Sequence, residues 1–191
     1  MVFTSYTGSF GSYLVDAVPR LSTSCTVPYQ LMAQANGVFT DGIAVRLADI
    51  SDGTASTLFV AERATGNLQR FDMVMPSLFA GSGWWFSGNL RATLTTSFFP
   101  PNMIKRVGPG AGTNHASAAS SLHPGGLNAL MGDGSVRFVK DTVDTWDYDL
   151  TTGKPVGARQ PPGGWWIDLP PAGIWQKLAS RSGFDVINTD F

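Results

Sequence analysis

The sequence predicts an α+β fold that is mostly β, with an antiparallel sheet, long loops and one short helix near the C-terminus. Glycine (22 residues) and proline (12 residues) are plentiful and helical periodicity is scarce, a combination that favours turns and short strands. Two apolar-rich runs flank Asp133-Gly134, which predicts a β-hairpin over residues 127–139. The 191 residues are 43% hydrophobic, so we expect a single globular domain over residues 1–191.

Charge and cysteine content argue against several kinds of partner and site. Only 14% of residues are charged and the formal net charge is -1, which offers no electrostatic basis for binding nucleic acid or an anionic membrane. Cys25 is the only cysteine, so the chain has neither an internal disulfide nor a thiolate zinc site. No stretch is long and apolar enough to span a bilayer, and we expect the chain as given to be soluble.

The first well-defined strand is expected over residues 57–62, where β-branched and apolar residues follow the turn signal Ser51-Asp52-Gly53-Thr54. Residues 1–40 predict short irregular strands and loops, and residues 63–113 predict a long connection with short strands. Glu62 ends the expected strand. It is either a surface carboxylate, which we favour, or a ligand.

Tryptophans in the long connection and near the C-terminus allow two interpretations. Trp84 and Trp85 form either an exposed stacking platform for a sugar or a partner, or a cap on the core beneath the loop. We favour the cap. Under the first interpretation, Trp165 and Trp166 extend the platform into a carbohydrate-binding module.

The hairpin at residues 127–139 carries the most specific local signal. A two-residue type I′ loop at Asp133-Gly134 sets Met131 opposite Val136 and Ala129 opposite Phe138 on one dry face, and leaves the other face mixed. His123 precedes the first strand. A straight strand would separate it from Asp133 by roughly 30 Å, so the two are expected not to touch, and His123 is expected to make a structural hydrogen bond.

An acidic segment follows the hairpin, with carboxylates at Asp141, Asp144, Asp147 and Asp149. Several oxygen donors in one loop suit calcium, but the spacing is not that of an EF-hand. We favour a solvated acidic loop after an edge strand. Beyond a connector rich in proline and glycine, a short helix is expected over residues 171–181, with an apolar stripe of Ile174, Trp175 and Leu178. A last strand is expected over residues 184–187.

The sequence contains few residues or motifs that are typical of catalytic sites. It contains no G-x-S-x-G, H-E-x-x-H, C-x-x-C or phosphate-binding glycine motif. An enzyme would hydrolyse small esters or lactones, with His123 as general base, Glu62 or Asp133 orienting its imidazole, or a bound metal activating water. We expect a protein that is not an enzyme.

Three segments resemble one bacterial family. His123, nine intervening residues and Asp133-Gly134, in the context H-P-G-G-x-N-x-L-x-x-D-G-S-V-R-F, resemble the prepilin-like family defined by a His-x9-Asp-Gly domain. Residues 50–62, I-S-D-G-T-A-S-T-L-F-V-A-E, are similar to that family's I-T-D-G-T-S-N-T-x-x-V-G-E. Residues 175–187 are similar to its closing helix and strand.

The resemblance implies a pseudopilin-like head with a structural or assembly role in the bacterial envelope or the type II secretion apparatus. It implies an extracytoplasmic location and protein partners or self-association, and it is compatible with a small-molecule ligand. The family's prepilin leader and long apolar helix have no counterpart in residues 1–191, so we expect the globular head alone. Because pseudopilins of type II secretion often hold calcium in a C-terminal loop, the resemblance favours calcium at residues 141–149.

Overall fold

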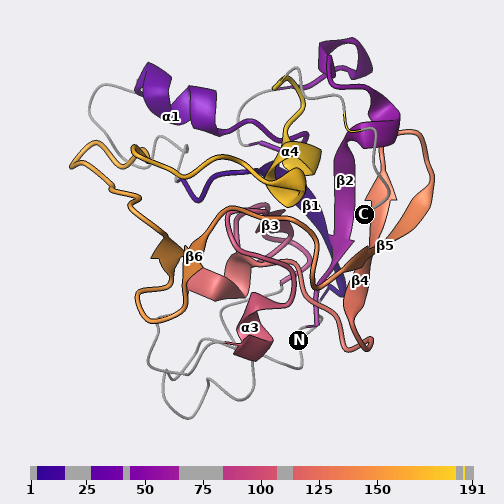
Figure 1. Cartoon of the computed structure of the whole chain (residues 1–191). Coiled ribbons are helices and arrows are strands. Elements are labelled where there is room, and N and C mark those ends of the chain that lie inside the picture. The colour runs from indigo at the N-terminus through magenta and orange to yellow at the C-terminus, as the bar shows by residue number, and fades with distance from the viewer. Residues whose placement is uncertain are drawn as a thin grey trace.

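The computed structural model describes residues 4–15, 27–40, 44–64, 84–106, 114–183 and 187, and of Asn114 the backbone only. Cys25 lies outside the described residues, and so does the strand expected over residues 184–187 apart from Ile187. In Figure 1 the strands β2, β4 and β5 lie on the right of the molecule, and α1, α3 and β6 lie to their left.

A five-stranded mixed sheet organises the described chain, in the order β3-β1-β2-β4-β5. Its strands are β1 (Tyr6–Gly11), β2 (Leu58–Glu62), β3 (Leu94–Thr96), β4 (Gly126–Met131) and β5 (Val136–Lys140). The pairs β1/β2, β2/β4 and β4/β5 are antiparallel, as expected, whereas β1 and β3 run parallel. A parallel neighbour needs a long crossover, which the distance in sequence between β1 and β3 provides.

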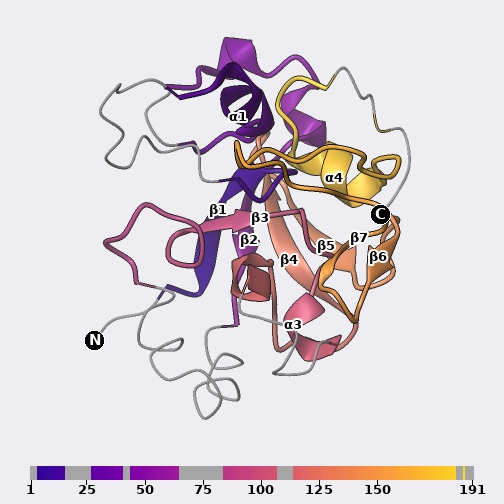
Figure 2. The same ribbon diagram turned by 90° about the vertical axis from the view of Figure 1, so that its left-hand side faces the viewer.

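Short helices and a small second sheet complete the described structure. The helices are α1 (Tyr29–Gln34), α3 (Met103–Arg106), α4 (Ile174–Ala179) and the 3₁₀ turns η1 (Leu47–Asp49), η2 (Thr54–Ser56) and η5 (Asn114–Ser117). The second sheet pairs β6 (Tyr148–Asp149) with β7 (Lys154–Pro155). In Figure 2 these two strands lie below α4. The mostly β prediction is confirmed, while α1 lies in a stretch that was expected to be irregular.

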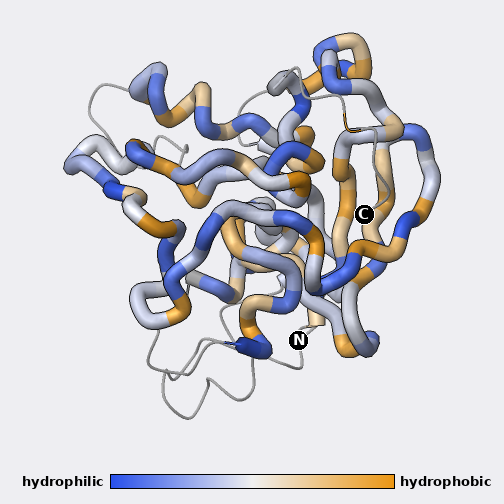
Figure 3. Tube along the Cα trace, viewed as in Figure 1, coloured by the Kyte–Doolittle hydropathy of each residue, from blue (hydrophilic) through white to orange (hydrophobic). Residues whose placement is uncertain are grey.

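The helix α4 closes the core over the inner face of the sheet. Its apolar stripe is confirmed, because Trp175 and Leu178 are fully buried in one cluster with sheet residues such as Leu58, Leu127 and Val139. Apolar residues recur along the strands at the right of Figure 3. A second cluster, rich in aromatic side chains, gathers Phe98, Phe99, Trp146, Trp166 and their neighbours.

Gln176 of α4 holds distant backbone segments together inside this core. Its Oε1 accepts the N–H of Trp146 at 3.0 Å, and its Nε2 donates to the carbonyl of Ser97 at 2.8 Å. Its own carbonyl accepts the hydroxyl of Ser12 at 2.5 Å. The side-chain amide and the backbone carbonyl of Gln176 are thus both paired inside the core. They stabilise one specific packing, because leaving any of these partners unpaired is unfavourable.

The hairpin is confirmed, but its loop and register differ from the prediction by one residue. Leu130 lies opposite Val136 and Ala129 lies opposite Arg137. The N–H of Gly134 donates to the carbonyl of Met131 at 3.0 Å, and the N–H of Met131 donates to the carbonyl of Ser135 at 2.8 Å. These bonds define a three-residue loop over residues 132–134 in which only Gly134 has positive φ (87°).

The side chain of Asp133 explains why the loop is longer. Its Oδ1 accepts the N–H of Ser135 at 2.9 Å and the hydroxyl of the same residue at 2.6 Å, an Asx turn that stabilises ordinary backbone angles at the aspartate. The slip of one residue reverses which β5 side chains point inward. Val139 is therefore buried, whereas Val136 and Phe138 are 66% and 44% exposed. The buried face of the hairpin keeps Ala129 and Met131 of β4 as expected, but from β5 it contains Val139 in place of Val136 and Phe138.

Candidate functional site

His123 and Glu62 meet at the outer face of the sheet. Glu62 is the last residue of β2 and His123 lies in the turn before β4, with its Nε2 3.3 Å from Oε1 of the carboxylate. The carboxylate also accepts the backbone N–H of Asn128 at 2.8 Å and its side-chain amide at 3.1 Å. The Glu62 side chain is only 12% exposed, whereas the imidazole is 55% exposed. Of the expected partners of His123, the structure selects Glu62.

The surroundings of Glu62 keep it ionised. Burial alone would raise the pKa of its carboxyl, but several interactions with the charged form together outweigh burial. They are the hydrogen bonds from the backbone and side chain of Asn128, the hydrogen bond from Ser121 and the charge of His123. The net effect lowers the pKa of Glu62 below its ordinary value. An ionised carboxylate therefore anchors this corner of the sheet at neutral pH.

The same contacts limit the chemistry that the pair can perform. The hydroxyl of Ser121 accepts the backbone N–H of His123 at 3.2 Å and donates to Glu62, so it is bound to the carboxylate and not to the imidazole. A nucleophile activated by histidine needs a direct hydrogen bond to it. The arrangement can orient an imidazole toward water, and it fastens the turn before β4 to β2.

Asp133 takes no part in this site. It follows β4, whereas His123 precedes β4, and its carboxylate is bound to Ser135 in the hairpin loop. The hydrogen bonds from Ser135 lower the pKa of Asp133. The two residues that carry the motif therefore brace opposite ends of one strand.

Residues 2–145 match the model of a family described as protein of unknown function DUF1559 (SBP_bac_10). The matched residues make up more than half of the chain and contain the whole five-stranded sheet. The chain belongs to the DUF1559 family. No curated protein and no solved structure matches it.

In this DUF1559 member three of the four aspartates that follow the hairpin have separate local partners for their carboxylates. Asp141 accepts the side-chain amide of Asn102 at 2.6 Å, Asp144 accepts the N–H of Ile174 at 3.1 Å, and Asp149 binds the backbone and hydroxyl of Thr152. Within the described ranges no three histidine, cysteine or acidic side chains are grouped so that they could hold a metal ion. Calcium binding at Asp141, Asp144, Asp147 and Asp149 therefore stays a prediction.

The tryptophan pairs divide between surface and core. Trp84 stacks on Phe86 with ring centroids 5.2 Å apart, and Trp85 meets Phe86 edge-on at 6.1 Å. Trp85 is 62% exposed, so the expected core cap is wrong for this residue. Trp166 is buried instead, and its indole N–H donates to the carbonyl of Leu14 at 2.7 Å.

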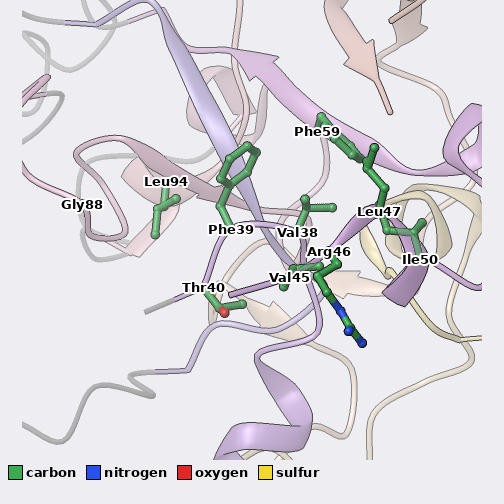
Figure 4. A pocket seen from close by; sticks show the side chains of 10 residues that line it. All are labelled: Val38, Phe39, Thr40, Val45, Arg46, Leu47, Ile50, Phe59, Gly88 and Leu94. Atoms are coloured by element: carbon green, nitrogen blue, oxygen red, sulfur yellow. The ribbon is translucent and has the colours of Figure 1, made fainter. Parts of the chain in front are cut away.

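A pocket of about 520 Å³ is lined by none of the residues that the sequence suggested as a site. Its wall is mostly apolar, and Phe39 and Phe59 meet edge-to-face with ring centroids 6.3 Å apart. Figure 4 shows both rings among the lining side chains. Arg46 at its rim is neutralised by Asp49, with the guanidinium 2.8 Å from the carboxylate. The absence of a side chain on Gly8 makes room for Phe39, because a Cβ there would lie 2.7 Å from the Phe39 ring. Sequence patterns alone would not reveal this packing.

Two buried polar residues, Asn102 and Arg63, were also missed in the sequence analysis. Asn102 accepts the N–H of Ser121 at 2.8 Å and binds Asp141, so it joins the segments before and after the hairpin. The guanidinium of Arg63 donates to the carbonyls of Ala92 and Leu94, and burial, assisted by the charge of Arg91, lowers its pKa to about 9. Burial also lowers the pKa of His115.

Proposed function

We propose that this DUF1559 chain is a pseudopilin-like head domain with a structural role in assembly at the bacterial envelope, in the manner of a type II secretion apparatus, and that it is not an enzyme. The observation that carries the proposal is that both residues of the hairpin motif make structural contacts. His123 braces the turn before β4 through Glu62, and Asp133 forms the loop after β4 through Ser135. Both residues therefore maintain the fold. The family match provides the pseudopilin-like context.

The outer face of the sheet supports a role in assembly. Tyr6 of β1, Phe138 of β5 and Leu122 before β4 are 60%, 44% and 74% exposed. Exposed apolar side chains on one sheet face favour contact with protein partners. No helix among the described residues is long and apolar enough to cross a membrane.

A genetic experiment in a bacterium that carries the gene tests this role. Deletion is expected to change the secreted or envelope proteins, and the wild-type gene is expected to restore them. A gene with His123→Ala is also expected to restore them, provided that the variant protein is folded, because a structural brace is only weakened by this change. If a folded His123→Ala protein fails to restore the phenotype and wild type hydrolyses activated esters that the variant does not, the chain is an enzyme.

The contact between His123 and Glu62 favours hydrolysis of small esters or lactones as a second candidate. In that reaction the imidazole would take a proton from water while Glu62 orients it. The test is turnover of a panel of activated esters and lactones by wild type, His123→Ala and Glu62→Gln. Turnover by wild type that both variants lose would establish the activity, whereas equal rates in all three would exclude this site.

The exposed ring of Trp85 favours a third candidate, carbohydrate binding. Tryptophan fluorescence titrated with a glycan panel is the measurement, with Trp85→Ala as the matched variant. A change in wild type that the variant lacks would support binding, and no change with any glycan would exclude it.

Calcium binding at residues 141–149 is tested by thermal unfolding. Stabilisation by bound calcium would raise the melting temperature when calcium is added and lower it with EGTA. Asp147→Asn is expected to remove the effect. No shift in wild type would exclude calcium.

A further inference from the structure

The strand β5 lies at the edge of the five-stranded sheet, and in the described part of the chain no strand pairs with its outer side. In the β4/β5 ladder, Met131 bonds to Ser135 and Asp141 bonds to Gly125. Antiparallel pairs alternate, so the N–H and C=O groups of Val136, Phe138 and Lys140 point away from β4. The carbonyl of Lys140 accepts the N–H of Val143 at 3.0 Å. The groups of Val136 and Phe138 have no hydrogen bond to a described residue.

The side chains on this edge are apolar and exposed. Val136 is 66% exposed and Phe138 is 44% exposed. The ring of Phe138 lies over Gly126, where a Cβ would be 2.7 Å from it. Edge strands are usually protected by charge, proline or a bulge, because unpaired edges accept another strand. Among Val136, Phe138 and Lys140, whose backbone groups point away from β4, only Lys140 provides such a charge.

Charges of opposite sign lie near the two ends of β5. Asp133 is exposed in the loop before the strand. Lys140 ends the strand, and Lys105 and Arg106 of α3 are exposed beside it, with Arg106 Nη2 donating to the carbonyl of Asp141 at 2.6 Å. The carboxylate of Asp141 at this end is bound to Asn102. The strand therefore has an anionic start and a mainly cationic end.

We propose that β5 pairs in antiparallel fashion with β5 of a second copy of this chain, across a twofold axis at Phe138. Antiparallel pairing brings the anionic start of each strand to the cationic end of the other. It sets Phe138 opposite Phe138 and Val136 opposite Lys140, with their outward backbone groups matched. The adjacent register, with Val136 opposite Phe138, would place Arg137 opposite Arg137 of the second copy, and like charges directly opposite are unfavourable.

A second copy suits this edge because the charge pattern is complementary to itself under twofold rotation. Closed twofold dimers are also the commonest oligomers of soluble proteins. Pairing covers the two exposed apolar side chains and satisfies the free backbone groups in one step. The inference does not depend on the proposed role at the envelope, since it rests on β5 alone.

Sedimentation velocity of the full chain over a range of protein and salt concentrations tests the pairing. Wild type is expected to form a dimer that weakens as salt rises. Val136→Lys places like charges opposite each other at two symmetry-related positions, and it is expected to raise the dissociation constant roughly tenfold or more. Val136→Glu faces Lys140 of the second copy and is expected to retain the dimer.

The double variant Val136→Lys/Lys140→Glu restores opposite charges in this register and is expected to recover dimerisation. Val156→Lys is the matched control, because it makes the same change at an exposed valine outside β5, and it is expected to leave the dimer unchanged. Far-UV circular dichroism and melting temperature establish that each variant is folded. Wild type that stays monomeric at the highest accessible concentration would overturn the proposal. So would a dimer that no β5 variant affects, or a double variant no better than Val136→Lys.

Discussion

Glu62 of β2 holds the imidazole of His123 at 3.3 Å, so the histidine of the hairpin motif is fastened to a neighbouring strand and not to the aspartate of its own motif. The two partners are unequal. Glu62 is largely buried and also binds Asn128, whereas half of the His123 side chain faces water.

This inequality predicts different effects of the two truncations. Glu62→Ala leaves the partly buried N–H of Asn128 without its acceptor and is expected to lower the free energy of unfolding by about 1–3 kcal/mol. His123→Ala removes only a half-exposed pair and is expected to cost at most about 1 kcal/mol. Urea denaturation followed by circular dichroism measures both. Equal losses would show that the imidazole carries more of the stability than its exposure allows.

The lowered pKa of Glu62 predicts a pH dependence on the acid side. Because the folded state favours the carboxylate, the stabilisation is complete above the ordinary value of 4.5 and is lost as pH falls through the lower folded pKa. Glu62→Gln retains an acceptor for Asn128 but cannot titrate. The difference in unfolding free energy between wild type and this variant is expected to be constant near neutrality and to shrink below pH 4.5. A difference that does not change with pH would contradict a contribution from ionised Glu62.

His115 predicts that folding stability also falls with falling pH in a second, higher pH range. The side chain is only 2% exposed, and neither ring nitrogen has a hydrogen-bond partner among the described residues. Burial lowers its pKa, so the unfolded chain binds a proton more readily, and stability is expected to fall as pH drops below 6.5. His115→Phe, packed against Phe99, is expected to flatten this slope and to stabilise the protein by on the order of 1 kcal/mol. Thermal unfolding on both sides of pH 6.5 is the measurement, and an unchanged slope would show that other groups cause the acid sensitivity.

The three-residue hairpin loop predicts a purely conformational penalty at Gly134. Its φ is 87° and no atom lies within 4 Å of a Cβ built there, so Gly134→Ala adds strain without a clash. The expected loss of unfolding free energy is about 1–2 kcal/mol. Gly88→Ala is the control, because that glycine has equal space without positive φ, and it is expected to be nearly neutral. Similar losses in both variants would argue against the left-handed conformation.

The fold could be predicted from sequence where a pattern is local. The strand ending at Glu62, the hairpin and the stripe of α4 follow from β-branched runs, turn residues and helical spacing, and the structure confirms each. The hairpin register could not, because Asp133-Gly134 suits both a two-residue and a three-residue loop. The side-chain bonds from Asp133 to Ser135 decide between them.

The candidate site shows the same division. His123 and Glu62 could be named as residues able to interact, but their contact depends on the pairing of β2 with β4, which no local pattern reveals. The pocket beside Phe39 and the buried polar residues Asn102 and Arg63 depend on tertiary packing in the same way. Local sequence patterns for turns and strands do not predict which loops contact each other in the folded protein.

Gln176 follows every strand of the five-stranded sheet along the chain, which has a consequence for synthesis on the ribosome. The hydroxyl of Ser12 bonds to its carbonyl across 164 positions, and Trp175 beside it fills the centre of the core. The inner face of the sheet therefore lacks its cover until α4 has left the exit tunnel. Contacts of such long sequence separation slow folding and leave apolar surface open to aggregation in the meantime. Nascent chains that end before residue 174 are thus expected to depend on chaperones more than chains from which α4 has emerged.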